Sequence, residues 1–78
     1  MNSFLLSRIT LDEAICHGKP TLRGSRLMVE AILELMASGM PHQELLDDYP
    51  GLEQDDLYAC LWYAVELSRF SSSRMVAA

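Results

Sequence analysis

Four side chains that are or can be positively charged lie close together in the segment ICHGKPTLRGSRLMV (residues 15–29): His17, Lys19, Arg23 and Arg26. Such a group is typical of a segment that contacts phosphate. The glycines do not fit a nucleotide-binding loop, because a P-loop needs GxxxxGK[ST] and a dinucleotide site needs GxGxxG within a βαβ unit. We therefore expect Gly18 and Gly24 to permit tight turns, and Pro20 to stiffen the chain between them.

The basic side chains of this segment leave two interpretations open. In the first, Lys19, Arg23 and Arg26 are DNA-binding residues, and a dimer doubles their contacts with phosphate. In the second, Arg23 and Arg26 are intramolecular, and they pair with Glu30, Glu34 or backbone carbonyls to fix this part of the chain to the body. The sequence alone does not choose between them.

The spacing of the Cys, His and Asp residues predicts neither a metal site nor a catalytic site. The possible zinc ligands are not arranged in close pairs such as CxxC or HxxxH, so no metal site is expected: they are Cys16, His17, His42 and Cys60. The neighbouring carboxylates Asp47 and Asp48, and likewise Asp55 and Asp56, diverge by about 100° on a helix and do not share a site. We interpret them as solvated surface and helix-end charge. The prediction is a protein that is not an enzyme and uses neither a cofactor nor a small-molecule substrate.

Charge and composition describe a small folded protein with a basic arm and an acidic body. Its 78 residues are half hydrophobic, with a net charge of −5. Residues 1–26 carry four Lys or Arg and two carboxylates, whereas residues 27–68 carry nine carboxylates and neither Lys nor Arg. The longest apolar run, LYACLWYAV (residues 57–65), is far shorter than the about 20 residues of a membrane span. With two cysteines and no recognisable signal peptide, we expect a cytoplasmic protein with free thiols.

Hydrophobic periodicity and turn residues predict the order of the elements. A short strand is expected at residues 8–11, and an extended piece at residues 21–22. A helix from Val29 should be stopped by Gly39. Pro41 is suited to the first position of a second helix, which must end by Tyr49 because Pro50 follows. A third helix should run from about residue 53 to about residue 69.

This order predicts a mainly α fold in which a short N-terminal β-arm precedes a three-helix core of the helix-turn-helix, homeodomain-like type. We expect one domain over residues 8–69. Residues 1–7 are predicted to form an N-terminal tail, and residues 70–78 a flexible C-terminal tail.

The third predicted helix is hydrophobic around its whole circumference, which one small domain cannot cover. We expect one face to enter the core: Leu57, Leu61, Ala64 and Val65. Tyr58 and Trp62 form another face, and together with Ile9 of the arm they are candidates for a homodimer or partner interface. The alternative is that Trp62 folds over the β-arm of its own chain.

Two motifs, GKPTLRGSR and DDYPGL, recur in this order in the prokaryotic domain-of-unknown-function 433 family, which the chain resembles from residue 8 to about residue 66. The positions that match the family pattern are Gly18, Pro20, Arg23, Gly24, Ser25, Arg26, Gly39, Tyr49, Pro50 and Leu52. The chain departs from the pattern at Pro41 and Glu53, where the family often has a capping Ser or Thr. Losing such a cap costs about 1 kcal/mol without changing the fold.

The resemblance implies a helix-turn-helix fold and similarity to antitoxins that bind and neutralise a PIN-like ribonuclease toxin and repress their own operon. We therefore expect a non-enzymatic, antitoxin-like homodimer with a toxin protein, and DNA, as its partners. The alternatives are a stand-alone DNA-binding transcriptional regulator that uses the basic arm, and a purely structural interaction module. DNA reading by the third helix is disfavoured, because carboxylates at its N-terminal end repel phosphate.

Overall fold

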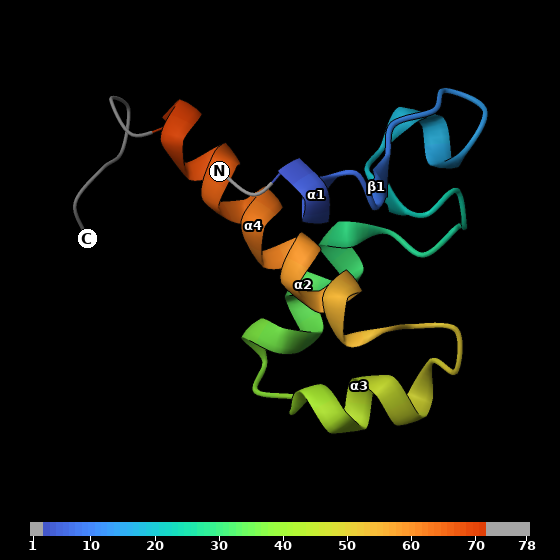
Figure 1. Cartoon of the computed structure of the whole chain (residues 1–78), viewed down its shortest axis with the longest axis vertical. Helices are drawn as coiled ribbons and strands as arrows, with labels where there is room; N and C mark the ends of the chain where they lie inside the picture. The colour runs from blue at the N-terminus through green and yellow to red at the C-terminus, as the bar shows by residue number, and fades with distance from the viewer. Residues whose placement is uncertain (1–2, 72–78) are drawn as a thin grey trace.

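The computed structural model describes residues 3–71 of the chain. It is mainly helical with one small two-stranded sheet (Figure 1). The elements in chain order are α1 (Ser3–Leu6), β1 (Ile9–Thr10), the 3-10 turn η1 (Cys16–Gly18), β2 (Thr21–Leu22), α2 (Val29–Ala37), α3 (His42–Asp48) and α4 (Gln54–Ser71). The mainly α fold with a short N-terminal β-arm is thus confirmed. No helix among the described residues is both long and apolar enough to cross a membrane.

The β-arm is an antiparallel pair in which Ile9 faces Leu22 and Thr10 faces Thr21. The connection between the strands carries left-handed backbone at Cys16, His17 and Gly18, so the single turn of η1 does not extend into a regular helix. Gly24 is left-handed as well, with φ +73°. The two glycines therefore make the tight turns that the sequence predicted. Pro20 lies between these turns, and its carbonyl accepts a hydrogen bond from the N–H of Val29 (3.0 Å).

Helix α2 ends as predicted, because Gly39 adopts φ +100° just beyond its last turn. Helix α3 begins one residue later than predicted. Pro41 has ψ 151°, which is extended, so it precedes the helix as its N-cap and His42 is the first helical residue. The helix ends at Asp48, and Pro50 prevents its continuation.

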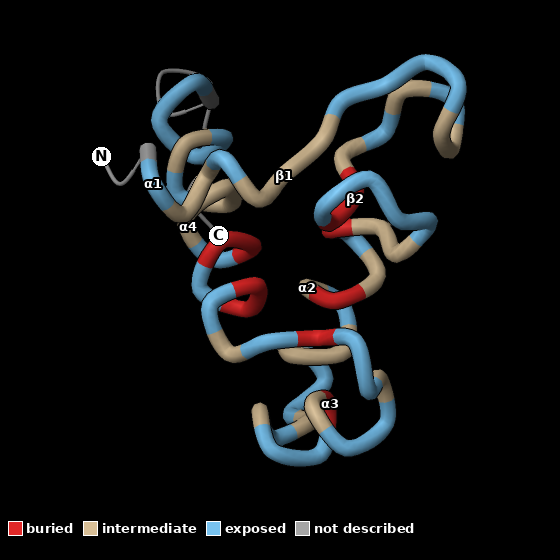
Figure 2. Tube along the Cα trace, turned by 45° about the vertical axis from the view of Figure 1, so that its right-hand side comes forward, coloured by how far each residue is buried: buried red, intermediate tan, exposed pale blue. Residues whose placement is uncertain are grey.

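Helix α4 packs against α1, α2 and α3 (Figures 1 and 2). The buried apolar core joins the arm to all three following helices: Leu22, Val29, Ile32, Leu45, Leu52, Leu57 and Cys60. The predicted core face of α4 was wrong in part. Leu57 is buried, but Leu61 is 39% and Val65 38% exposed. The inward face instead includes Asp56, Cys60 and Tyr63. Each lies one position before a residue of the expected face, which corresponds to a rotation of about 100° around the helix.

The predicted N-terminal tail needs a correction. Within it, Ser3–Leu6 forms α1, which packs on α4 (Figure 1). Leu5 and Leu6 are half-buried while Phe4 remains exposed. The contact between α1 and α4 therefore buries apolar surface of both helices. The predicted C-terminal tail begins inside α4, which extends to Ser71, and its remaining residues lie outside the described part of the chain.

Candidate functional site

A buried carboxylate, Asp56, joins the β-arm to the start of α4. Its side chain is 0% exposed. Arg23 at the end of β2 donates two hydrogen bonds to it, from Nε to Oδ1 (3.0 Å) and from Nη2 to Oδ2 (2.8 Å). Arg8 donates a third, from Nη1 to Oδ1 (3.1 Å). Two arginines from the arm therefore converge on one carboxylate of the helical body.

Asp56 also caps the helix on which it lies. Its Oδ2 accepts a hydrogen bond from the backbone N–H of Glu53 (2.8 Å), and its own N–H donates to the Glu53 carbonyl (2.9 Å). This reciprocal pair resembles a capping box, so the N-terminus of α4 is capped although Glu53 occupies the position of the family's Ser or Thr. Burial opposes ionisation of Asp56, but the hydrogen bonds from Arg23, the Glu53 backbone and Arg8 outweigh it and lower the pKa of the carboxyl group.

The interpretation of Asp56 as solvated helix-end charge was therefore wrong. Its neighbour Asp55 is exposed, as predicted. Position in the helix separates the two: Asp56 is the third residue of α4, where a side chain folds back onto the first turn. That spacing from Glu53 is the signal in the sequence that identifies the cap, whereas the pairing with Arg8 and Arg23 depends on tertiary structure.

Arg23 makes a further contact with the turn between α3 and α4. Its Nη2 donates to the carbonyl oxygen of Gly51 (2.6 Å), and its own backbone is left-handed with φ +48°. The intramolecular interpretation of Arg23 is therefore what the structure shows. Its acidic partner is Asp56, however, rather than the expected Glu30 or Glu34.

The other basic residues of the arm differ in their surroundings. Lys19 pairs with Glu30 (2.9 Å), which raises the pKa of the lysine. Arg26 and His17 are exposed. Within residues 3–71, Arg26 forms no ion pair. Of the candidate DNA-binding residues, only Arg26 thus presents a cation that is not already matched by a carboxylate of the described chain.

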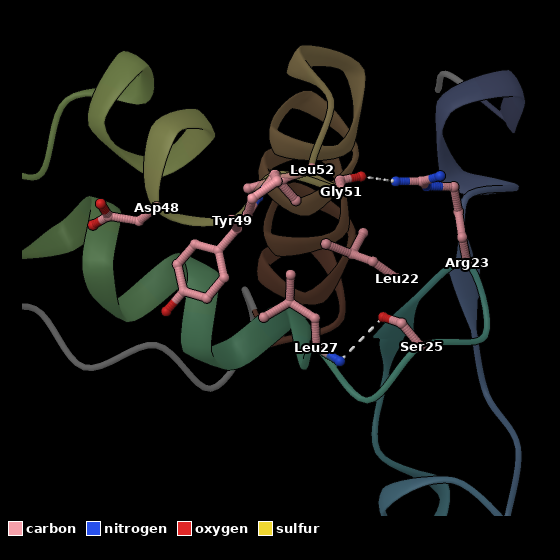
Figure 3. Close-up of a pocket in the computed structure, with 9 residues that line it drawn as sticks. Leu22, Arg23, Ser25, Leu27, Asp48, Tyr49, Gly51 and Leu52 are labelled. Carbon is pink, nitrogen blue, oxygen red and sulfur yellow. Dashed lines mark hydrogen bonds between the residues drawn. The ribbon is translucent and has the colours of Figure 1, made fainter.

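The two sequence motifs meet at a cleft of about 430 Å³. The turn after β2 forms one wall and the turn between α3 and α4 the other (Figure 3). The lining residues are Leu22, Arg23, Ser25, Leu27, Asp48, Tyr49, Pro50, Gly51 and Leu52. The motif residues Tyr49 and Pro50 therefore shape a surface as well as ending a helix, and the bond from Arg23 to Gly51 ties the two walls together.

A second surface lies on the side of α4 that faces away from the core. Four large side chains recur there with helical spacing, Tyr58, Leu61, Trp62 and Val65, which we call the α4 stripe. Tyr58 is 44% exposed, and Trp62 is half-buried. Tyr58 makes an edge-to-face contact with His42, whose Nδ1 lies 2.9 Å from Nε2 of Gln54. Ile9 does not join the stripe, because it is half-buried against the core of its own chain.

The cysteines and histidines do not converge. Among residues 3–71, no group of three or more His, Cys, Asp or Glu side chains is placed to hold a metal ion. Cys16 and Cys60 are both free thiols. Burial raises the pKa of the Cys60 thiol to about 12, so it remains protonated at neutral pH.

Comparisons with known proteins agree with the motifs. The profile of the family described as "Protein of unknown function (DUF433)" matches residues 9–64. The crystal structure of a DUF433 member protein from Anabaena variabilis is similar, with 30% sequence identity and a TM-score of 0.70, over 92% of this chain and 70% of that chain. No curated protein matches the sequence. Since the profile spans most of its length, this chain belongs to the DUF433 family.

Proposed function

We propose that this protein is a non-enzymatic, antitoxin-like homodimer that binds and neutralises a PIN-like ribonuclease in the cytoplasm and represses its own operon. The observation that carries the proposal is the α4 stripe, a row of four large apolar or aromatic side chains on the face of α4 opposite the core. Contiguous apolar surface of this kind marks protein–protein contact sites.

The stripe suits a second copy of the same helix. Tyr58, Leu61 and Val65 are each more than a third exposed, and two antiparallel α4 helices would bury them against one another around a two-fold axis. Trp62, the only tryptophan of the chain, lies within the stripe. Dimerisation also compensates for the small core that a chain of this length can build.

The acidic body is the surface we assign to the ribonuclease. Four exposed carboxylates lie where α3 ends and α4 begins: Asp47, Asp48, Glu53 and Asp55. Glu53 and Asp55 pair with Arg8 (2.7 and 3.7 Å), so Asp47 and Asp48 supply most of the unmatched negative charge. A ribonuclease that binds an RNA backbone presents cationic surface at its active site, and opposite charge speeds the encounter of two proteins. The arm stabilises the body through Arg8 and Arg23, and the acidic body attracts the partner.

The test is co-expression of this chain with any PIN-like ribonuclease whose gene adjoins its own. We expect a stable complex on size exclusion and loss of ribonuclease activity at equal molar amounts. The double variant Tyr58→Ser, Leu61→Ser should separate the homodimer into monomers, whereas the surface variant Glu34→Gln should leave it intact. Full ribonuclease activity with excess protein would overturn the antitoxin proposal, and a double variant that stays dimeric would overturn the assignment of the stripe.

A DNA-binding regulator with a helix-turn-helix core is the second candidate, and the exposed Arg26, which forms no ion pair within residues 3–71, favours it. Lys19 and Arg23 contribute less, since each already pairs with a carboxylate. Glu53 and Asp55 at the start of α4 repel phosphate. This candidate predicts DNA affinity that falls steeply with salt and is weakened by Arg26→Ala. Affinity that is independent of salt would exclude it.

A further inference from the structure

The cleft between the two motifs has an apolar middle and two different polar ends. The side chains of Leu22, Leu27 and Leu52 form the middle, and the ring of Tyr49 lies beside Leu27 (Figure 3). Leu22 and Leu52 are almost fully buried, with 2% and 7% exposure. Leu22 belongs to the arm, Leu27 to the connection between the arm and α2, and Leu52 to the turn between α3 and α4. Three separate segments therefore form the apolar floor of the cleft.

The end of the cleft at Arg23 carries little free charge. Arg23 is matched there by the buried carboxylate of Asp56 and by the carbonyl oxygen of Gly51. The hydroxyl of Ser25 accepts a hydrogen bond from the N–H of Leu27 (3.1 Å). An anionic ligand would have to compete with Asp56 for the guanidinium group, and this end therefore does not select for anions.

The opposite end carries negative charge. Asp48 lies beyond the Tyr49 ring, at the outer edge of the lining (Figure 3). It is exposed, and within residues 3–71 its carboxylate forms neither an ion pair nor a side-chain hydrogen bond. Asp48 is also the last residue of α3, where the helix carries negative partial charge. This end therefore favours a cation.

We propose that the cleft binds a segment of the partner protein in which an apolar side chain is followed directly by arginine or lysine. The apolar side chain enters between Leu22, Leu27 and Leu52. The cationic side chain passes over the ring of Tyr49, where a cation–π contact is available, and pairs with the carboxylate of Asp48.

This inference rests on the proposed function in one respect, since the partner that supplies the segment is the ribonuclease. The cleft lies between the arm and the end of α3, where it borders the acidic body assigned to that partner, and its lining includes no residue of the α4 stripe used by the second copy. General charge attraction brings the two proteins together, and the apolar and cationic side chains bound in the cleft determine which docked arrangement is stable.

The first test uses three capped tetrapeptides, Gly-Leu-Arg-Gly, Gly-Leu-Glu-Gly and Gly-Ala-Arg-Gly, each titrated into the full chain and followed by amide NMR spectra. One buried leucine and one exposed ion pair correspond to a dissociation constant of about 1–10 mM. We expect the Leu-Arg peptide to shift the amide signals of Ser25, Leu27, Gly51 and Leu52. Gly-Leu-Glu-Gly and Gly-Ala-Arg-Gly should each bind at least about fivefold more weakly than Gly-Leu-Arg-Gly. Equal shifts with all three peptides, or none with Leu-Arg, would overturn the inference.

A matched pair of variants supplies the second test. Asp48→Asn removes the proposed cation partner, whereas Asp47→Asn makes the same change at a neighbouring carboxylate that accepts a hydrogen bond from Gln43 (3.0 Å) outside the cleft. Asp48→Asn should weaken binding of the Leu-Arg peptide about three- to fivefold more than Asp47→Asn does, because a solvent-exposed ion pair contributes only modestly to binding. Equal effects would count against the cleft.

The two proposals fail in distinguishable ways. If the ribonuclease is neutralised but Asp48→Asn binds it as tightly as Asp47→Asn does, the cleft assignment is wrong and the antitoxin proposal stands. If the peptide binds as described but the ribonuclease is not inhibited, the cleft is a peptide site and its partner is a different protein.

Discussion

Asp56 and Arg23 are joined by two parallel hydrogen bonds of 3.0 and 2.8 Å, although they are separated by 33 positions in the sequence. The pair attaches the end of β2 to the first turn of α4. Because Asp56 is buried and also caps α4, one carboxylate determines both where the helix begins and where the arm lies.

Replacing Asp56 by asparagine should therefore destabilise the fold. The amide keeps one oxygen to accept a hydrogen bond but loses the charge that Arg8 and Arg23 require, so we expect the free energy of unfolding to fall by about 2–3 kcal/mol in urea titrations. The matched control is Asp55→Asn, because Asp55 is exposed and lies 3.7 Å from Arg8. That control should change stability by less than about 0.5 kcal/mol. Equal losses in the two variants would contradict a special role for Asp56.

The same carboxylate makes stability depend on pH in a defined direction. The arginines and the Glu53 backbone lower the pKa of Asp56 in the folded chain, against the effect of burial. The ionised carboxylate therefore contributes its full stabilisation above the unfolded pKa of about 3.9, and this contribution is lost as the pH falls towards the folded pKa. We expect the difference in unfolding free energy between the native chain and Asp56→Asn to be constant above about pH 5 and to shrink below about pH 4. A constant difference down to about pH 2 would show that Asp56 does not titrate in this way.

Thr21 offers a site where removing a polar group should stabilise the protein. Its side chain is fully buried, and its Oγ1 has no hydrogen-bond partner among the described residues. Thr21→Val keeps the shape and removes the unsatisfied hydroxyl, so the free energy of unfolding should rise by about 0.5–1.5 kcal/mol. Thr10→Val is the matched control on the facing strand, since Oγ1 of Thr10 accepts a hydrogen bond from the N–H of Gly24 (2.9 Å). The control should lose about 1 kcal/mol. A destabilised Thr21→Val variant would mean that the hydroxyl has a partner.

The elements of this fold could be predicted because local chemistry determines their ends. Gly39 is left-handed where α2 ends, and Pro50 limits α3, so the residues themselves mark the boundaries. The face of α4 that enters the core could not be predicted in the same way. With apolar residues all around the helix, periodicity gives no preferred direction, and the buried Asp56 decides it.

The candidate site was predicted only in part. The motif residues Tyr49 and Pro50 were identified, but as features that end a helix, because nothing local indicates that they lie opposite Ser25 across a cleft. Nothing in the sequence indicated a role for Arg8, because its partner Asp56 lies 48 positions away. Likewise, α1 is too short to be recognised from periodicity and exists through its packing on α4.

The two thiols should differ sharply in reactivity. Cys60 is fully buried, and burial raises its pKa to about 12, whereas Cys16 is partly exposed at the tip of the arm. In the variant Cys16→Ser at about pH 8, the remaining thiol should react with dithionitrobenzoate only as fast as the chain unfolds, because the thiolate is the reactive form. In Cys60→Ala, Cys16 should react at the rate of an accessible thiol, and in urea both variants should react fully. Fast labelling of native Cys16→Ser would show that α4 opens locally around Cys60, so that the core is less closed in solution than in the structure.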